Sequence, residues 1–190
     1  MNHQINIMVP KHQLKVNCFE FLMDELVKWV NESGGNPKRD LNLLKVVKLN
    51  FFVAAASSSE NNEGLLSVFD EFYALPYGHV ESDVYNIIKG NPKASLNKYT
   101  IVSNGINWLN DDIITIDDKY SNSIKSSIDK IKVIDSDFVL RPAGYLVDLS
   151  HMWRSWKLMY STAKSLNKHA IKIPNNLIQT ESKIFKLSLQ

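Results

Sequence analysis

Residues 71–88, EFYALPYGHVESDVYNII, contain the clearest structural signal in the chain. An aromatic, strand-like run leads into a turn at Pro76, Tyr77 and Gly78. Proline presets φ at such a turn, and glycine permits a positive φ where two buried elements meet. A helix is predicted to follow, because apolar residues recur on one face: Val80, Val84, Ile87 and Ile88. Periodicity leaves open whether residues 65–77 are helix or strand.

The segment before this turn is predicted to be helical. Residues 19–30 repeat apolar side chains every three or four positions, with Glu20, Asp24 and Lys28 on the polar face. The Gly34–Pro37 run ends this helix. Residues 1–15 are polar and mixed, so we expect an N-terminal arm there.

A second helix, capped by Asp40, is predicted to extend to about Ser57. It is apolar nearly all round except for a narrow polar stripe of Lys45 and Lys48. Such a helix belongs in the middle of a bundle.

The remaining elements favour a single, mainly α domain over residues 1–190. Residues 93–120 have no clear period and are predicted to be irregular. Further helices are expected around residues 124–131, after Pro142 and after Pro174. The fold class is therefore mainly α, with a short strand or hairpin near residues 68–79.

The composition is that of a soluble domain in a reducing compartment. The 190 residues suffice for a substantial core, and the formal net charge of +2 is too small to demand nucleic acid or a membrane as partner. Cys18 is the only cysteine, so no internal disulfide can form. We expect a cytoplasmic location, because the first residues do not resemble a signal peptide.

Catalytic, metal and cofactor sites are not expected from the motifs. The five histidines lack ligand spacing, and no phosphate-cradling glycine loop or nucleophile elbow is present. The aspartate pairs at residues 111–112 and 117–118 lack a calcium-loop pattern, so a solvated loop is favoured. His151 is best interpreted as a half-buried histidine whose ring bonds a backbone carbonyl at a helix end.

The C-terminal third is basic and leaves a second function open. Aromatic residues there alternate with cations, as in proteins that track a phosphate backbone while bases stack. Three aromatics, Trp153, Trp156 and Tyr160, also fall at the spacing of a buried helix face, which favours a wet cationic face with the aromatic rings turned inward. The candidate nucleic-acid contacts are Arg154, Lys157, Lys164 and Lys168.

Three blocks of sequence resemble the Panacea domain, a small bacterial and phage family. They are the apolar run Leu43–Leu49, the turn region Phe72–Val80 followed by Val84-Tyr85, and Leu149-Ser150-His151 with Trp156 five residues later. His79 stands where the family usually has proline, and Val47-Lys48 replaces a common Leu-Tyr pair. The resemblance covers roughly residues 40–187, preceded by the arm and helix of residues 1–35.

Family members pair with toxins and neutralise them, so the resemblance implies a non-catalytic, antitoxin-like module that binds a cognate toxin protein. Two other interpretations remain open: a nucleic-acid-binding accessory protein, and a subunit of a phage-defence or counter-defence assembly. The resemblance also marks four residues as a structural motif, namely Pro76, Gly78, His151 and Trp156.

The turn is the expected partner-binding surface, because loops keep their backbone groups near water. Tyr77 and His79 should flank Gly78 at the surface, beside acidic residues in the first turn of the next helix. An aromatic, an imidazole and two carboxylates on one ridge suit recognition of a basic partner. The predicted contacts are Tyr77, His79, Glu81, Asp83 and Tyr85.

Overall fold

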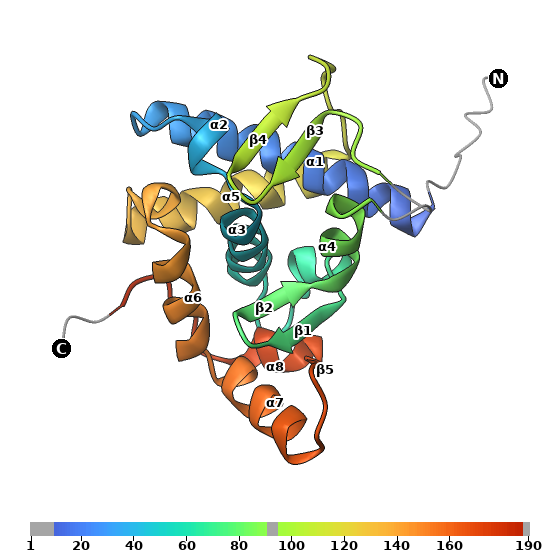
Figure 1. Ribbon diagram of the computed structural model, residues 1–190, viewed down its shortest axis with the longest axis vertical. Helices are drawn as coiled ribbons and strands as arrows, with labels where there is room; N and C mark the ends of the chain where they lie inside the picture. Colours follow the sequence, from blue (N-terminus) through green and yellow to red (C-terminus); the bar gives the residue numbers. More distant parts are fainter. Residues whose placement is uncertain (1–9, 91–94, 188–190) are drawn as a thin grey trace.

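The computed structural model describes residues 10–90 and 95–187, and it is mainly helical (Figure 1). The helices are α1 Lys11–Glu32, α2 Pro37–Asp40, α3 Leu43–Ser57, α4 Ser82–Ile88, α5 Asp118–Ile134, α6 Ala143–Met152, α7 Arg154–Ser165 and α8 Asn175–Thr180. Two 3-10 turns cover Gly64–Ser67 and Phe138–Leu140. None of the helices in the described ranges combines the length and apolar character needed to cross a membrane.

The strands form two small antiparallel sheets. One has the order β2-β1-β5, with β1 Phe72–Leu75, β2 Gly78–Glu81 and β5 Ile171–Lys172. The other pairs β3 Tyr99–Val102 with β4 Gly105–Trp108. The predicted mainly α fold with a hairpin near residues 68–79 is confirmed.

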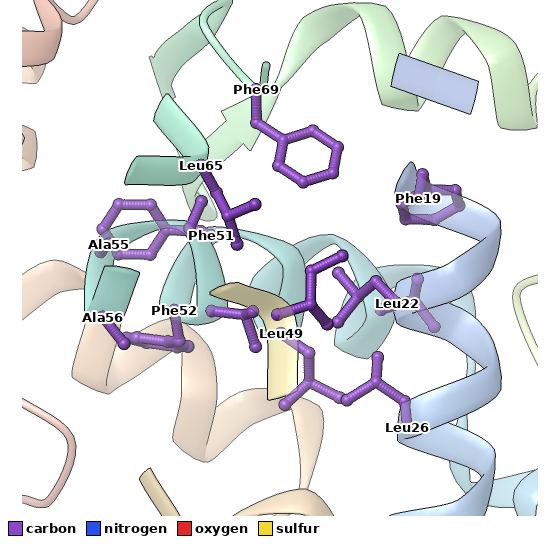
Figure 2. Close-up of a cluster of buried hydrophobic side chains, with 14 of the residues drawn as sticks. Phe19, Leu22, Leu26, Leu49, Phe51, Phe52, Ala55, Ala56, Leu65 and Phe69 are labelled. Atoms are coloured by element: carbon purple, nitrogen blue, oxygen red, sulfur yellow. The ribbon is translucent and has the colours of Figure 1, made fainter. Parts of the chain in front are cut away.

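Helix α3 lies at the centre of the core, as its apolar composition predicts. Figure 2 shows Leu22 and Leu26 of α1 pointing toward Leu49 of α3, all fully buried. Helix α5 packs on another side of α3 through a stripe of isoleucines that includes Ile124 and Ile131. Burying each such side chain contributes about 1.5–3 kcal/mol, so α3 organises the whole domain.

Several boundaries differ from the sequence prediction. The N-terminal arm was predicted over residues 1–15, but helix α1 already begins at Lys11. Residues 1–9 of the predicted arm lie outside the described residues. Asn42, not Asp40, caps α3: its side chain accepts a hydrogen bond from the backbone N–H of Lys45. Asp40 is instead the last residue of α2, and its side chain accepts a hydrogen bond from the backbone N–H of Asn36, just before that helix, at 2.7 Å.

The expectation that residues 93–120 are irregular is wrong for the β3–β4 hairpin. Two residues, Ser103 and Asn104, connect its strands, and Val102 pairs with Gly105. The alternation of buried Tyr99 and Ile101 with exposed neighbours is a strand signal, but it is only four residues long.

The polar face expected on α1 is also partly buried. Glu20 is fully buried and accepts backbone N–H bonds from Asn97 at 2.6 Å and Lys98 at 2.7 Å. Asp24 accepts the Tyr99 hydroxyl. These acids dock the β3–β4 hairpin on α1, which periodicity cannot foresee because the partners are more than 70 residues away.

Candidate protein-binding groove

The β1–β2 hairpin has the sharp turn that the sequence predicts. Pro76 and Tyr77 are exposed at its tip, and Gly78 has φ 92°, which confirms the expected positive φ. A Cβ atom on Gly78 would also meet the Ser150 hydroxyl, lie 2.8 Å from Ser150 Cβ and lie 3.0 Å from Lys48 Nζ. Gly78 is therefore required both by backbone conformation and by close packing on α6.

The expected surface position of His79 is wrong, because its side chain is fully buried. The ring stacks on Phe51 at a centroid distance of 3.7 Å. Its Nδ1 lies 2.8 Å from Ser150 Oγ, and its Nε2 lies 2.8 Å from Ser155 Oγ. Burial, with smaller contributions from the charges of Lys48 and His151, holds the pKa of His79 well below its usual value. A neutral ring that satisfies both nitrogens anchors the hairpin to α6 and α7.

Lys48 is the second unexpected polar group beneath the hairpin. Its side chain is fully buried rather than part of a wet stripe, and Nζ donates to the His79 carbonyl at 2.6 Å. On the same side of β2, the His79 N–H donates to Ser150 Oγ at 3.0 Å. Burial lowers the pKa of Lys48 to about 7. At His79, the outer edge of β2 is thus satisfied by side chains.

Glu81 is also buried, which corrects its placement on the predicted ridge. Its carboxylate lies 2.6 Å from Lys15 Nζ and accepts the backbone N–H of Val84 at 2.7 Å, so it caps α4 from inside. Lys15 also bonds Asp83 at 2.6 Å and Asp70 at 3.1 Å. Burial alone would lower the pKa of Lys15, but the Glu81 charge and the hydrogen bonds that Lys15 donates to these acids outweigh it and raise the pKa.

The predicted structural residues His151 and Trp156 hold the opposite side of the turn. His151 is half-buried, and its Nε2 lies 3.0 Å from the Pro76 carbonyl, as its interpretation from the sequence requires. Trp156 Nε1 donates to the Leu75 carbonyl at 2.8 Å. The two rings stack at 3.9 Å, so α6 and α7 grip the hairpin tip together.

An apolar groove of about 490 Å³ lies beside the tip of this hairpin. It is built by the first turns of α3, the β1–β2 turn, α4 and the β3–β4 turn, which surround one end of α3 in Figure 1. Tyr77 is 65% exposed and Tyr85 38% exposed at this groove. The groove is lined by Leu43, Leu44, Val47, Leu75, Pro76, Tyr77, Val80, Tyr85 and Ser103.

The other hollows found on the described surface are more polar. The hollow between α1 and α5, for example, is lined mainly by Glu25, Lys28, Glu32, Lys125, Asp129 and Lys132. No group of three or more His, Cys, Asp or Glu side chains that could hold a metal ion occurs within residues 10–90 and 95–187. The arrangement beside the turn is therefore suited to apolar contact.

The structure brings together only part of the predicted ridge. Tyr77 and Tyr85 line the groove, and Asp83 is exposed although it is tied to Lys15. His79 and Glu81 lie beneath the surface as supports. Sequence reasoning missed the groove residues on α3, such as Leu44 and Val47, although their spacing on one helix face was a usable signal.

The four candidate cations of the C-terminal third, Arg154, Lys157, Lys164 and Lys168, are all exposed. Trp153 is fully buried, and its Nε1 donates to the Ile184 carbonyl at 3.0 Å. Trp156 and Tyr160 are half-buried and stack at 4.8 Å. The aromatic residues thus face inward, as the helical spacing favours.

The fold and the groove define a mainly helical domain built around a clamped β-hairpin. Residues 46–157 match the family model described as antitoxin SocA-like, Panacea domain. The chain belongs to this family, which confirms the resemblance seen in the sequence. No curated protein and no solved structure matches the chain.

Proposed function

We propose that this protein is a non-catalytic antitoxin that neutralises a cognate toxin protein by direct binding at the apolar groove. The single observation that carries the proposal is the groove itself, with Tyr77 and Tyr85 exposed on a domain of an antitoxin family. Tyrosines at the centre of an interface are frequent hot spots, because each buries a large rigid surface and keeps a hydroxyl for hydrogen bonding.

The groove is suited to binding because its walls are held from below. The hairpin is fixed by Lys48, by His79 and by Trp156 through buried or half-buried hydrogen bonds. A partner therefore orders little of the chain when it docks, and less of the contact energy is lost as conformational entropy. Removing most of the exposed Tyr77 ring from water would contribute about 2–3 kcal/mol.

The occupant that fits this lining is an apolar segment of the toxin. A volume of about 490 Å³ with no charged side chain in its lining suits a few large aliphatic or aromatic side chains. An amphipathic helix presents such side chains at three- and four-residue steps, so helix-in-groove docking is the favoured mode. Asp83 lies outside the groove lining, but 53% of its side chain is exposed beside Lys15, so it remains a candidate for a cation on a partner that extends beyond the groove.

This proposal places both proteins in the cytosol, where a chain with one buried free thiol is suited to the reducing conditions. The decisive experiment is co-expression with the product of the adjacent reading frame. Growth inhibition by that product should be relieved, and the two proteins should elute together on size exclusion.

Tyr77→Ala combined with Tyr85→Ala should abolish rescue while the melting temperature stays within a few degrees of wild type. Leu109→Ala is the matched control, because Leu109 is 59% exposed and lies outside the groove lining. Persistent toxicity at equal expression, with no complex on size exclusion, would show that the antitoxin proposal is wrong. Full rescue by the double tyrosine variant would move the binding surface elsewhere.

A further inference from the structure

The charges of this chain are divided unevenly along the sequence. Residues 149–190 contain seven of the 22 Lys and Arg but only one of the 20 Asp and Glu, which is Glu181. The small net charge of +2 therefore conceals an acidic body and a basic C-terminal third. Such asymmetry indicates an anionic partner for the basic part.

Helix α7 carries three of these seven cations on one face. At 100° per residue, Arg154, Lys157 and Lys164 fall within an arc of about 80°, and Ser161 lies inside that arc. The opposite face carries the buried Ser155 and Ala163. Lys168 follows the helix as a fourth exposed cation, and α7 forms the lower end of the molecule in Figure 1. We call these four cations the α7 cationic face.

Nothing in the described part of the chain neutralises this face. No carboxylate lies within ion-pair distance of its four cations among residues 10–90 and 95–187. Glu181 turns inward and accepts the backbone N–H of Ser155 at 3.1 Å, at the first turn of α7. The one acid of the region is thus used to cap the helix.

We propose that the α7 cationic face binds the phosphate backbone of nucleic acid, independently of base sequence. The arc consists of cations and a hydroxyl, the side chains that contact phosphate oxygens. Lysine is depleted at the cores of protein interfaces, so this face does not resemble a protein-binding hot spot. Arg154 and Lys164 are about 15 Å apart along the axis, which allows contacts with several phosphates of one strand.

Base stacking does not contribute, which is why the binding is independent of sequence. The Trp156 ring stacks on two neighbours, His151 at 3.9 Å and Tyr160 at 4.8 Å between ring centroids. The Tyr160 ring is in turn covered by Lys164 Nζ, 4.6 Å from its centroid. The rings of this ladder are engaged by one another and by Lys164, so we expect the backbone rather than the bases to be contacted.

The face shares no residue with the groove lining, so the inference goes beyond toxin neutralisation and does not depend on it. Binding of the full chain to a labelled single strand and to a labelled duplex of mixed sequence is measured by fluorescence anisotropy. With four phosphate contacts, the affinity for duplex should fall about 100-fold between about 50 and 200 mM salt.

Lys157→Glu with Lys164→Glu should lower the affinity at least tenfold and reduce the salt slope by about two. Lys38→Glu with Lys125→Glu is the control, because it makes the same change in net charge at exposed lysines on other elements. Circular dichroism checks that each variant is folded. If the variant with Lys157→Glu and Lys164→Glu does not fold, Lys157→Gln with Lys164→Gln is measured in its place.

Two results would overturn the proposal. An equal loss of affinity in the α7 variant and its control would mean that net charge, rather than this face, attracts the nucleic acid. Poly-glutamate that competes as well as DNA at equal charge concentration would assign the face to acidic proteins instead. Loss confined to the α7 variant, with weak competition by poly-glutamate, supports the proposal.

Discussion

At the scale of single residues, Gly78 is required for two separable reasons. Gly78 and Gly90 have similar backbone angles, φ 92° and φ 85°, but of these two glycines only Gly78 has neighbours among residues 10–90 and 95–187 within 4 Å of an added Cβ. Gly90→Ala should therefore lose about 1 kcal/mol through backbone strain alone, whereas Gly78→Ala should lose about 1–3 kcal/mol more, because Ser150 and Lys48 must move. Urea unfolding of the two variants measures the difference, and equal losses would contradict the close packing described for the hairpin.

Lys48 makes a second residue-scale prediction, which concerns pH. Its pKa is lowered from 10.5 to about 7 by burial, so between these values the unfolded chain binds more protons than the folded one. The free energy of unfolding should therefore rise with pH across this window, by at most about 1.4 kcal/mol per pH unit from this group. Below pH 7 the amine is charged in both states, and its contribution to the slope disappears.

The measurement compares wild type with Lys48→Met by urea unfolding between pH 7 and pH 9. Methionine keeps the apolar stem but cannot titrate, so the difference between the two unfolding free energies should change with pH in favour of wild type as the pH rises. A difference that stays constant over this range would show that Lys48 keeps an ordinary pKa in the folded protein.

At the scale of elements, the ion pairs of α1 should contribute very different amounts to the free energy of unfolding. Lys15 joins α1 to β2 and α4 through buried Glu81, whereas Lys11 pairs with Asp70 at 2.5 Å on the surface, with 66% of its side chain exposed. Lys15→Met leaves a buried carboxylate without its cation and should cost about 3–5 kcal/mol. Lys11→Met should cost less than about 1 kcal/mol. Thermal unfolding compares the stability of the two variants. Similar losses of stability in both would mean that Glu81 is neutral or hydrated in the folded protein.

Sequence reasoning succeeded at this scale where the signal is local. The Pro76-Tyr77-Gly78 sequence predicted the turn with a positive φ at Gly78, and helical periodicity predicted α1, α3 and α5. It failed for His79 and Glu81, because their burial depends on partners 66 or more residues away, such as Lys15 and Ser150. From the sequence, a histidine next to a turn glycine is expected to be exposed, because the helices that cover His79, α6 and α7, come 60 or more residues later in the chain. The groove as a whole could not be predicted for the same reason, since four separate segments build it, although the spacing of Leu44 and Val47 indicated its α3 wall.

At the scale of the whole molecule, the groove and the α7 cationic face should act independently, because they share no residue. Tyr77→Ala should weaken toxin binding at least tenfold and leave nucleic-acid affinity within about twofold, and Lys157→Glu with Lys164→Glu should do the reverse. Analytical ultracentrifugation of a mixture of the three components should then detect a ternary complex. Mutual exclusion of toxin and nucleic acid would mean that the two surfaces are coupled.

The side chains along the outer edge of β2 have a consequence for behaviour at high concentration. An edge strand with free backbone groups is a template on which a second chain can pair, and such pairing starts strand-swapped polymers and fibrils. On that edge, Lys48 already donates to the His79 carbonyl, and Ser150 accepts the His79 N–H. The opposite edge strand, β5, is only two residues long and carries Lys172. Neither edge of this sheet therefore offers a long free register, so we expect the β2-β1-β5 sheet to resist edge-to-edge pairing between copies even when the protein is abundant.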